Sequence, residues 1–170
     1  EQVEDPATAQ GLVKRAITRT FTPGCIDDLE GLSLNEPNYI MAVHEDPKSH
    51  KWSMLISDVS TGELRLGNLN SVKDVSKWVE RIRPKEILAR KFFHDDLEEL
   101  LSIYKSDHQL LIESLPESAL RDLADQKTLL TEVFGKSKLS SQMCGDIKGG
   151  EALVAAFIVH LRGLNAGLNQ

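Results

Sequence analysis

The sequence is poor in several residue types, and each shortage excludes a class of protein. It holds only two cysteines among 170 residues. Cys25 and Cys144 have neither CxxC spacing nor neighbouring ligands, so we expect two free thiols instead of a zinc site or a disulfide framework. No apolar run approaches the roughly 20 residues of a membrane helix, and the polar start lacks signal-peptide character. We therefore expect a cytosolic protein.

Basic residues are also scarce relative to acidic ones. Lys and Arg total 20 against 26 Asp and Glu, which gives a formal net charge of -6. Because phosphate contacts usually need a basic face, this balance argues against a dedicated nucleic-acid binder while leaving local basic patches open. The chain does have 41% hydrophobic residues, which at this length predicts one well-buried core.

Hydrophobic periodicity predicts an α/β fold. Apolar patterns predict three strands at residues 39–43, 52–59 and 63–69, whose short connections make them antiparallel neighbours. Helical periods then alternate with two short apolar runs, and Ser71 with Asp74 forms a capping-box variant. The predicted helices cover residues 71–82, 95–104, 114–134 and 150–162, and the predicted strands residues 86–89 and 109–112. Strands joined through helices are normally parallel, so the order predicts a ribonuclease-H-like mixed five-stranded sheet flanked by helices.

Asp58 is the acidic residue whose position raises a catalytic alternative. It falls in the sheet region where ribonuclease-H-like nucleases place a metal-binding aspartate, and that chemistry needs several carboxylates around two Mg²⁺ ions. Glu86 is the only plausible partner, since the remaining acidic pairs occupy turns or helix starts. We therefore favour a structural role for Asp58 at its turn, and predict no catalytic residue and no metal ligand.

Five cations between residues 81 and 91 raise the question of DNA contact. They could touch a phosphate backbone, although cations at a helix end and at strand flanks are usually solvated. The candidates for DNA-backbone contact are Arg81, Arg83, Lys85, Arg90 and Lys91.

The third predicted helix is apolar on two sides. One side carries leucines and Phe134, whereas Leu129 and Val133 project elsewhere beside Gln126. Two interpretations stay open. The helix is either sandwiched between the sheet and another element, or it exposes Gln126, Leu129 and Val133 as a strip on which a partner protein docks.

Four separated segments resemble the MutS family of DNA mismatch-recognition proteins, in that family's order. Residues 58–64, with the sequence DVSTGEL, resemble a family signature. Residues 5–15 and 22–24 look like the passage from the mismatch-reading domain into the connector domain, although Cys25 stands where the family commonly has Thr. Residues 83–88 and 152–162 fit the later connector and the start of the central lever domain.

The resemblance implies a domain organisation and a role. Residues 1–25 would link the preceding domain, residues 26–148 would form the connector, and residues 149–170 would be a helix leading into the lever. The implied role is non-catalytic, namely coupling the mismatch-reading domain to the lever and ATPase core and contributing to recruitment of a MutL-type partner. Lacking an initiator Met and starting inside a family motif, the chain is expected to be a fragment of a bacterial cytoplasmic protein, associated with the nucleoid during repair.

Cofactors are expected only in the full-length protein. The chain has neither the GxxxxGK[ST] nucleotide loop nor the family's Phe-x-Glu mismatch wedge, so ATP, Mg²⁺ and mismatched duplex DNA would be bound elsewhere in that protein. Two alternatives remain. One is a Mg²⁺-dependent ribonuclease-H-like nuclease, and the other is a free-standing protein-interaction module.

Overall fold

A computed structural model of the chain describes residues 38–102, 104, 110–121, 123–135, 147 and 149–164. The expectations for residues 1–25, including Cys25, and for Cys144 lie outside these residues.

Five strands form a single mixed sheet in the order β3-β2-β1-β4-β5. β1 pairs antiparallel with β2, and β2 with β3, through the short connections that the sequence indicated. β1 pairs parallel with β4, and β4 with β5. The strand bounds are Tyr39–Glu45 for β1, Trp52–Asp58 for β2, Glu63–Leu69 for β3, Glu86–Ala89 for β4 and Leu111–Ser114 for β5. The ribonuclease-H-like order predicted from the sequence is therefore confirmed.

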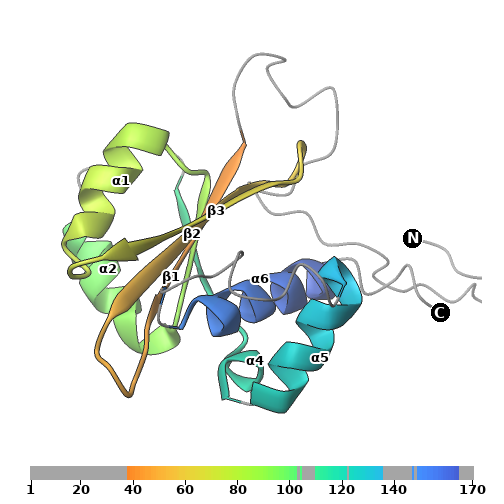
Figure 1. The fold of residues 1–170 in the computed structure, drawn as a ribbon. Coiled ribbons are helices and arrows are strands. Elements are labelled where there is room, and N and C mark those ends of the chain that lie inside the picture. The colour runs from red at the N-terminus through yellow and green to blue at the C-terminus, as the bar shows by residue number, and fades with distance from the viewer. Residues whose placement is uncertain are drawn as a thin grey trace, which may run out of the picture.

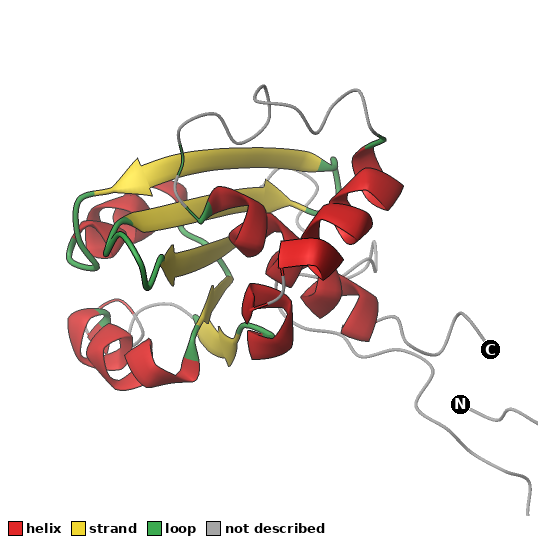
Figure 2. Cartoon of the chain, turned by 60° about the horizontal axis from the view of Figure 1, so that its bottom comes forward, coloured by secondary structure: helices red, strands yellow, loops and turns green. Residues whose placement is uncertain are grey.

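Helices cover both faces of the sheet (Figure 1). One face carries α1 and α2 with the short helix η1, and the other carries α4, α5 and α6. Figure 2 shows the same layers from a second direction, with helices on either side of the strands. The helix bounds are Asp74–Ile82 for α1, Lys91–Phe93 for η1, His94–Leu100 for α2, Glu117–Arg121 for α4, Leu123–Phe134 for α5 and Gly150–Leu164 for α6.

Two hydrophobic cores follow from the alternation of side chains along the strands. In β1, Met41 and Val43 point into the core beneath α1 and α2. Ile40 and Ala42 point the other way, into the core that α5 and α6 cover. Both sets are fully buried. β1 therefore reads as an unbroken apolar run because it is buried on both faces.

The third predicted helix differs from the structure at its start. Residues 114–134 were expected as one helix, whereas the structure has α4 and α5 and begins α4 at Glu117. The expected first residue of this helix, Ser114, instead pairs with Ala89 as the last residue of β5. The N–H of Leu115 then donates to the carbonyl of Ala89 at 2.9 Å. Pairing with β4 thus carries the strand two residues beyond the predicted 109–112.

The start of α1 also differs from a complete capping box. The carboxylate of Asp74 accepts a hydrogen bond from the N–H of Asn70 at 3.2 Å, and the N–H of Asp74 donates to the carbonyl of Ser71 at 3.1 Å. The N-cap residue is Lys73, which makes no side-chain capping bond. Only the half of the motif contributed by Asp74 is therefore present, through contacts of its carboxylate with the backbone of Asn70 and of Ser71.

Candidate interaction surfaces

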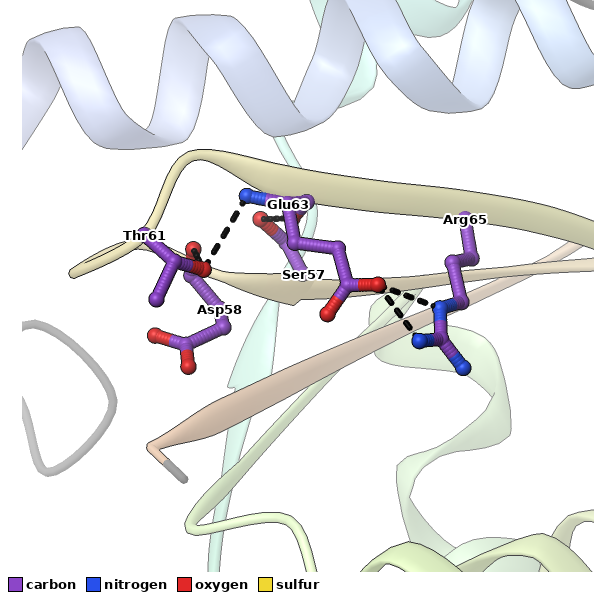
Figure 3. A network of polar contacts seen from close by, with 5 residues as sticks. All are labelled: Ser57, Asp58, Thr61, Glu63 and Arg65. Carbon is purple, nitrogen blue, oxygen red and sulfur yellow. Dashed lines mark hydrogen bonds and ion pairs between the residues drawn. The ribbon is translucent and has the colours of Figure 1, made fainter. Parts of the chain in front are cut away.

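Asp58 closes the turn between β2 and β3. Its Oδ1 accepts hydrogen bonds from the N–H of Ser60 at 3.0 Å and from the Ser60 hydroxyl at 2.6 Å. Thr61 lies in the same turn, and its Oγ1 accepts a hydrogen bond from the N–H of Glu63 at 3.3 Å (Figure 3). Gly62 takes the left-handed backbone conformation, with φ 73°, which suits a residue without Cβ. The DVSTGEL segment is therefore a local turn-forming unit, and Asp58 has a structural place in it.

The sheet register separates Asp58 from Glu86. Asp58 pairs with Tyr39 of β1, whereas Glu86 pairs with the next residue, Ile40. Because successive strand residues point to opposite faces, the two carboxylates lie on opposite sides of the sheet and cannot share a metal ion. Within the described part of the chain, no three His, Cys, Asp or Glu side chains are grouped as a metal site would need.

Glu86 instead contacts α6. Its Oε1 lies 3.1 Å from Nε2 of His160, while its side chain is fully buried and that of His160 nearly so. The second carboxylate oxygen, Oε2, has no hydrogen-bond partner among the described residues. Sequence reasoning missed this contact. The available signal was the single acidic residue at the start of the apolar strand Glu86–Ala89, because a buried charge needs a partner.

The five candidate DNA-contacting cations fall into two groups. Arg81, Arg83 and Lys85 are exposed near the beginning of β4, while Arg90 and Lys91 follow its end. At about 3.3 Å per strand residue, Lys85 and Arg90 lie roughly 16 Å apart. The cations are therefore not one continuous basic patch.

Arg90 differs from the other four cations because it is half-buried beside His44. The Nε atom of Arg90 and the Nδ1 atom of His44 are both buried, and neither has a hydrogen-bond partner in the part of the chain that the structure describes. Burial lowers the pKa of His44 from its ordinary value, and the nearby Arg90 charge lowers it further, against weaker opposing effects of Asp46 and Glu45. Because the Arg90 side chain is half-buried beside His44, it is less suited to a phosphate contact than a fully exposed cation.

The predicted strip on the third helix is not continuous. Gln126 is buried and its Nε2 donates to the carbonyl of Ala119 at 2.7 Å, which ties α5 to α4. Leu129 is half-buried and packs against the core between the sheet and α6. Only Val133 is exposed, at 43% of its surface. The helix is thus packed on one side and presents a narrow apolar feature at Val133 on the other.

No helix among the residues described has the length and apolar character needed to cross a membrane.

The sheet order, the turn at Asp58 and the two helical layers define a ribonuclease-H-like α/β domain. A family model described as MutS domain II matches residues 38–161, which is more than half of the chain. The chain therefore belongs to the MutS domain II family, the connector domain of the DNA mismatch repair protein MutS.

Individual relatives agree with this assignment. The DNA mismatch repair protein MutS of Fervidobacterium nodosum is 32% identical over 149 residues, covering 87% of this chain and 18% of the relative. That of Acaryochloris marina is 31% identical over 154 residues, covering 85% and 17%. That of Thermosynechococcus vestitus is 42% identical over 88 residues, covering 52% and 10%. The chain thus spans less than a fifth of the length of these relatives.

Proposed function

We propose that this domain is a non-catalytic mechanical connector, which transmits conformational change between a mismatch-reading domain and the lever and ATPase core. Coupling of this kind requires a rigid body whose two attachment points move together. The observation that carries the proposal is the packing of the first strand and the last described helix in one core. Ile40 and Ala42 of β1 share that core with Leu153 and Phe157 of α6, and all four are buried.

The direction of α6 supports this proposal. Gly149, at its start, approaches the ring of His44 near the end of β1. Near the other end of α6, His160 contacts Glu86, and Glu86 pairs with Ile40 near the start of β1. α6 therefore runs antiparallel to β1, and the chain enters and leaves the described domain at the same end of the central strand. A movement of the start of β1 at Tyr39 would therefore be transmitted to the end of α6 at Leu164 through the side chains packed between them.

The proposed domain bounds place one attachment point before β1 and the other at α6. Residues 1–25 belong to the link from the mismatch-reading domain, residues 26–148 to the connector, and residues 149–170 lead towards the lever. Helix α6 is then both a layer of the connector and its exit.

The proposed partner is a MutL-type repair protein, and α5 is the proposed contact element. Val133 supplies an exposed apolar side chain, with Leu129 partly accessible beside it and Gln126 fixing the α4–α5 junction from below. Apolar side chains rimmed by polar ones favour protein contact. Binding of ATP, Mg²⁺ and mismatched duplex is assigned to other domains of the full-length cytoplasmic protein. Any DNA contact by Arg81, Arg83, Lys85, Arg90 and Lys91 would be auxiliary.

The coupling proposal is tested in the full-length protein by softening α6. Ala155 and Ala156 are fully buried against the sheet, and replacing both with Gly lowers helix propensity by about 1 kcal/mol each. The matched control is Ala124→Gly, an exposed position on α5. We expect the α6 variant to retain mismatch binding and basal ATP hydrolysis but to lose most of the change in ATP turnover that mismatched duplex causes. Unchanged mismatch dependence in a variant with loosened α6, verified by faster amide exchange, would contradict the proposal.

A separate measurement addresses the partner. Capture of this chain by an immobilised MutL-type protein, compared with capture by mismatched and perfectly paired duplex, distinguishes an interaction domain from a DNA reader. Capture by the protein alone supports the assignment, whereas selective capture by mismatched duplex would refute it.

A further inference from the structure

A groove lies between α1 and the edge strand β3, on the face of the sheet opposite to α5. It has a volume of about 340 Å³. Its floor is formed by Met54 and Ile56 of β2, which are buried members of the core beneath α1. Trp78 and Ile82 of α1 form one wall. The groove is lined by residues of α1 on one side and of the outer strand β3 on the other.

Gly67 opens the groove from the side of β3. It pairs with Met54, so a side chain at position 67 would project over that part of the floor. A Cβ built at this position would lie 3.1 Å from Cε of Met54, which is the movable end of a flexible side chain. A glycine inside a strand weakens the strand and marks a place where another backbone can approach closely. The missing side chain therefore leaves room for the Met54 side chain at the floor of the groove, and no turn requires the glycine.

β3 also has an open edge. Among the described residues it pairs only with β2, so one side of its backbone is unpaired within this part of the structure. Unpaired N–H and C=O groups along a strand of seven residues are a template for an added strand. Extended peptides bind such edges through main-chain hydrogen bonds, while pockets for alternate side chains give selectivity. The groove lies beside the strand and can receive one of those side chains.

The rim of the groove carries two arginines and one glutamate, Glu63, although the chain as a whole carries a net charge of -6. Arg65 forms an ion pair with Glu63, in which Nε of Arg65 donates to Oε1 of Glu63 at 2.7 Å. The Arg65 side chain is 69% exposed. Exposed pairs contribute little stability, so Arg65 can turn to a carboxylate of a ligand. Arg81 lies over the Trp78 ring, 5.4 Å from its centre, on the opposite rim. Two arginines flanking an apolar floor favour an acidic ligand with an apolar centre.

We propose that β3 and this groove bind an extended peptide segment in which an apolar side chain is flanked by acidic residues. The apolar side chain occupies the space above Met54 and Gly67, and the acidic residues contact Arg65 and Arg81. Single-stranded nucleic acid fits less well, because binding of bases depends on open aromatic faces and one face of Trp78 is already covered by Arg81. The proposal is independent of any MutL-type contact on α5.

The test uses the whole chain and a synthetic, fluorescein-labelled peptide of about nine residues, with a central Phe between two Val and an Asp on either side. Fluorescence anisotropy should report saturable binding. Gly67→Val, which fills the groove with a residue favoured in strands, and Arg65→Glu should each weaken binding at least about tenfold, a difference of 1.4 kcal/mol. The matched control is Lys51→Glu, an exposed charge reversal in the turn between β1 and β2. It should leave the affinity within about twofold.

Three outcomes overturn the proposal. The first is no saturable binding by the folded chain at peptide concentrations up to about 1 mM. The second is a peptide with Lys in place of both Asp that binds as tightly as the original peptide, or a Gly67→Val variant that binds the original peptide as tightly as the natural chain. The first result would contradict recognition by the arginines, and the other would contradict recognition by the groove. The third is preferential binding of labelled oligothymidylate that Arg65→Glu abolishes, which would assign the groove to nucleic acid. Thermal melting monitored by circular dichroism verifies that each variant is folded.

Discussion

Glu86 of β4 and His160 of α6 lie 3.1 Å apart between Oε1 and Nε2, and their contact joins the sheet to the last described helix across 74 residues of sequence. Both groups are largely removed from water. A buried carboxyl group is tolerated only when it has a partner, so this pair ties the exit helix to one position on the sheet.

We predict that His160→Leu destabilises the domain by about 2–4 kcal/mol, because it leaves a fully buried carboxyl group without a partner. The double variant Glu86→Leu with His160→Leu should recover most of this loss, since both polar groups are then gone. Urea unfolding of the four corners of this cycle measures the coupling. His50→Asn is the control, because His50 pairs with Glu45 at the surface and asparagine tolerates its left-handed backbone, φ 53°, so stability should change by no more than about 0.5 kcal/mol. A coupling energy near zero, with the double variant destabilised by the sum of the two single effects, would show that the contact is unimportant.

His44 predicts a specific pH dependence of stability. Its pKa in the folded domain is lowered, first by burial and then by the Arg90 charge, whereas the unfolded chain has the ordinary value of 6.5. The unfolded state therefore binds a proton more readily. Stability is fully present above pH 6.5 and is lost as the pH falls below that value towards the folded pKa.

The measurement is the free energy of unfolding from pH 8 to pH 5, for the natural chain and for His44→Leu. The slope below pH 6.5 should be smaller in the variant. Asp46, whose pKa is lowered by its hydrogen bonds with Ser49, acts only at lower pH, below its ordinary value of 3.8. An unchanged slope in His44→Leu would assign the effect to another group.

On α5, Asp substitutions at neighbouring positions should have opposite consequences. Val133→Asp places a charge on an exposed position, so the melting temperature should hardly change while capture by a MutL-type protein weakens. Leu129→Asp places the charge against the core and should destabilise the domain by several kcal/mol, roughly. Circular dichroism melting and pull-down are measured on both. If Val133→Asp is stable and binds the partner normally, the docking surface lies elsewhere.

Asp58→Ala should cost about 1–2 kcal/mol of stability, because two donors from Ser60 lose their acceptor. It should not remove an activity. Incubation of the natural chain with labelled RNA–DNA hybrid and Mg²⁺ or Mn²⁺ is expected to give no cleavage, since Asp58 and Glu86 face opposite sides of the sheet. Cleavage that disappears in Asp58→Asn would revive the nuclease interpretation.

DNA binding by this chain is expected to be weak, sensitive to salt and indifferent to a mismatch. Phosphate contacts carry no sequence information, and the two cation groups at opposite ends of β4 cannot act as one patch. Neutralising Arg81, Arg83 and Lys85 should lower the residual affinity more than neutralising Arg90 and Lys91, because Arg90 is half-buried beside His44. Filter binding at two salt concentrations measures this. Tight, mismatch-selective binding would contradict the expectation.

Much of the fold was readable in the sequence because its signals are local. The turn at Ser60–Gly62 fixed the hairpin between β2 and β3, and Pro84 marked the end of α1. The element order then allowed few sheet topologies, and the observed one is among them. Where local signals compete with pairing, as at Ser114, the sequence was a poorer guide. Ser114 followed by Glu117 matches the pattern of a helix start, but pairing with Ala89 of β4 makes Ser114 the last residue of a strand.

What the sequence determined by itself was the series of strands and helices, the turn chemistry around Asp58 and the membership of the MutS domain II family. Hydrogen bonding over a few residues and side-chain periodicity decide these, and both are present in the linear chain. Only the tertiary structure decided which side of the sheet each carboxylate faces, that Gln126 is buried and Val133 exposed, and that His160 contacts Glu86. These depend on strand register and helix packing, which bring together residues far apart in sequence through contacts that no local pattern encodes.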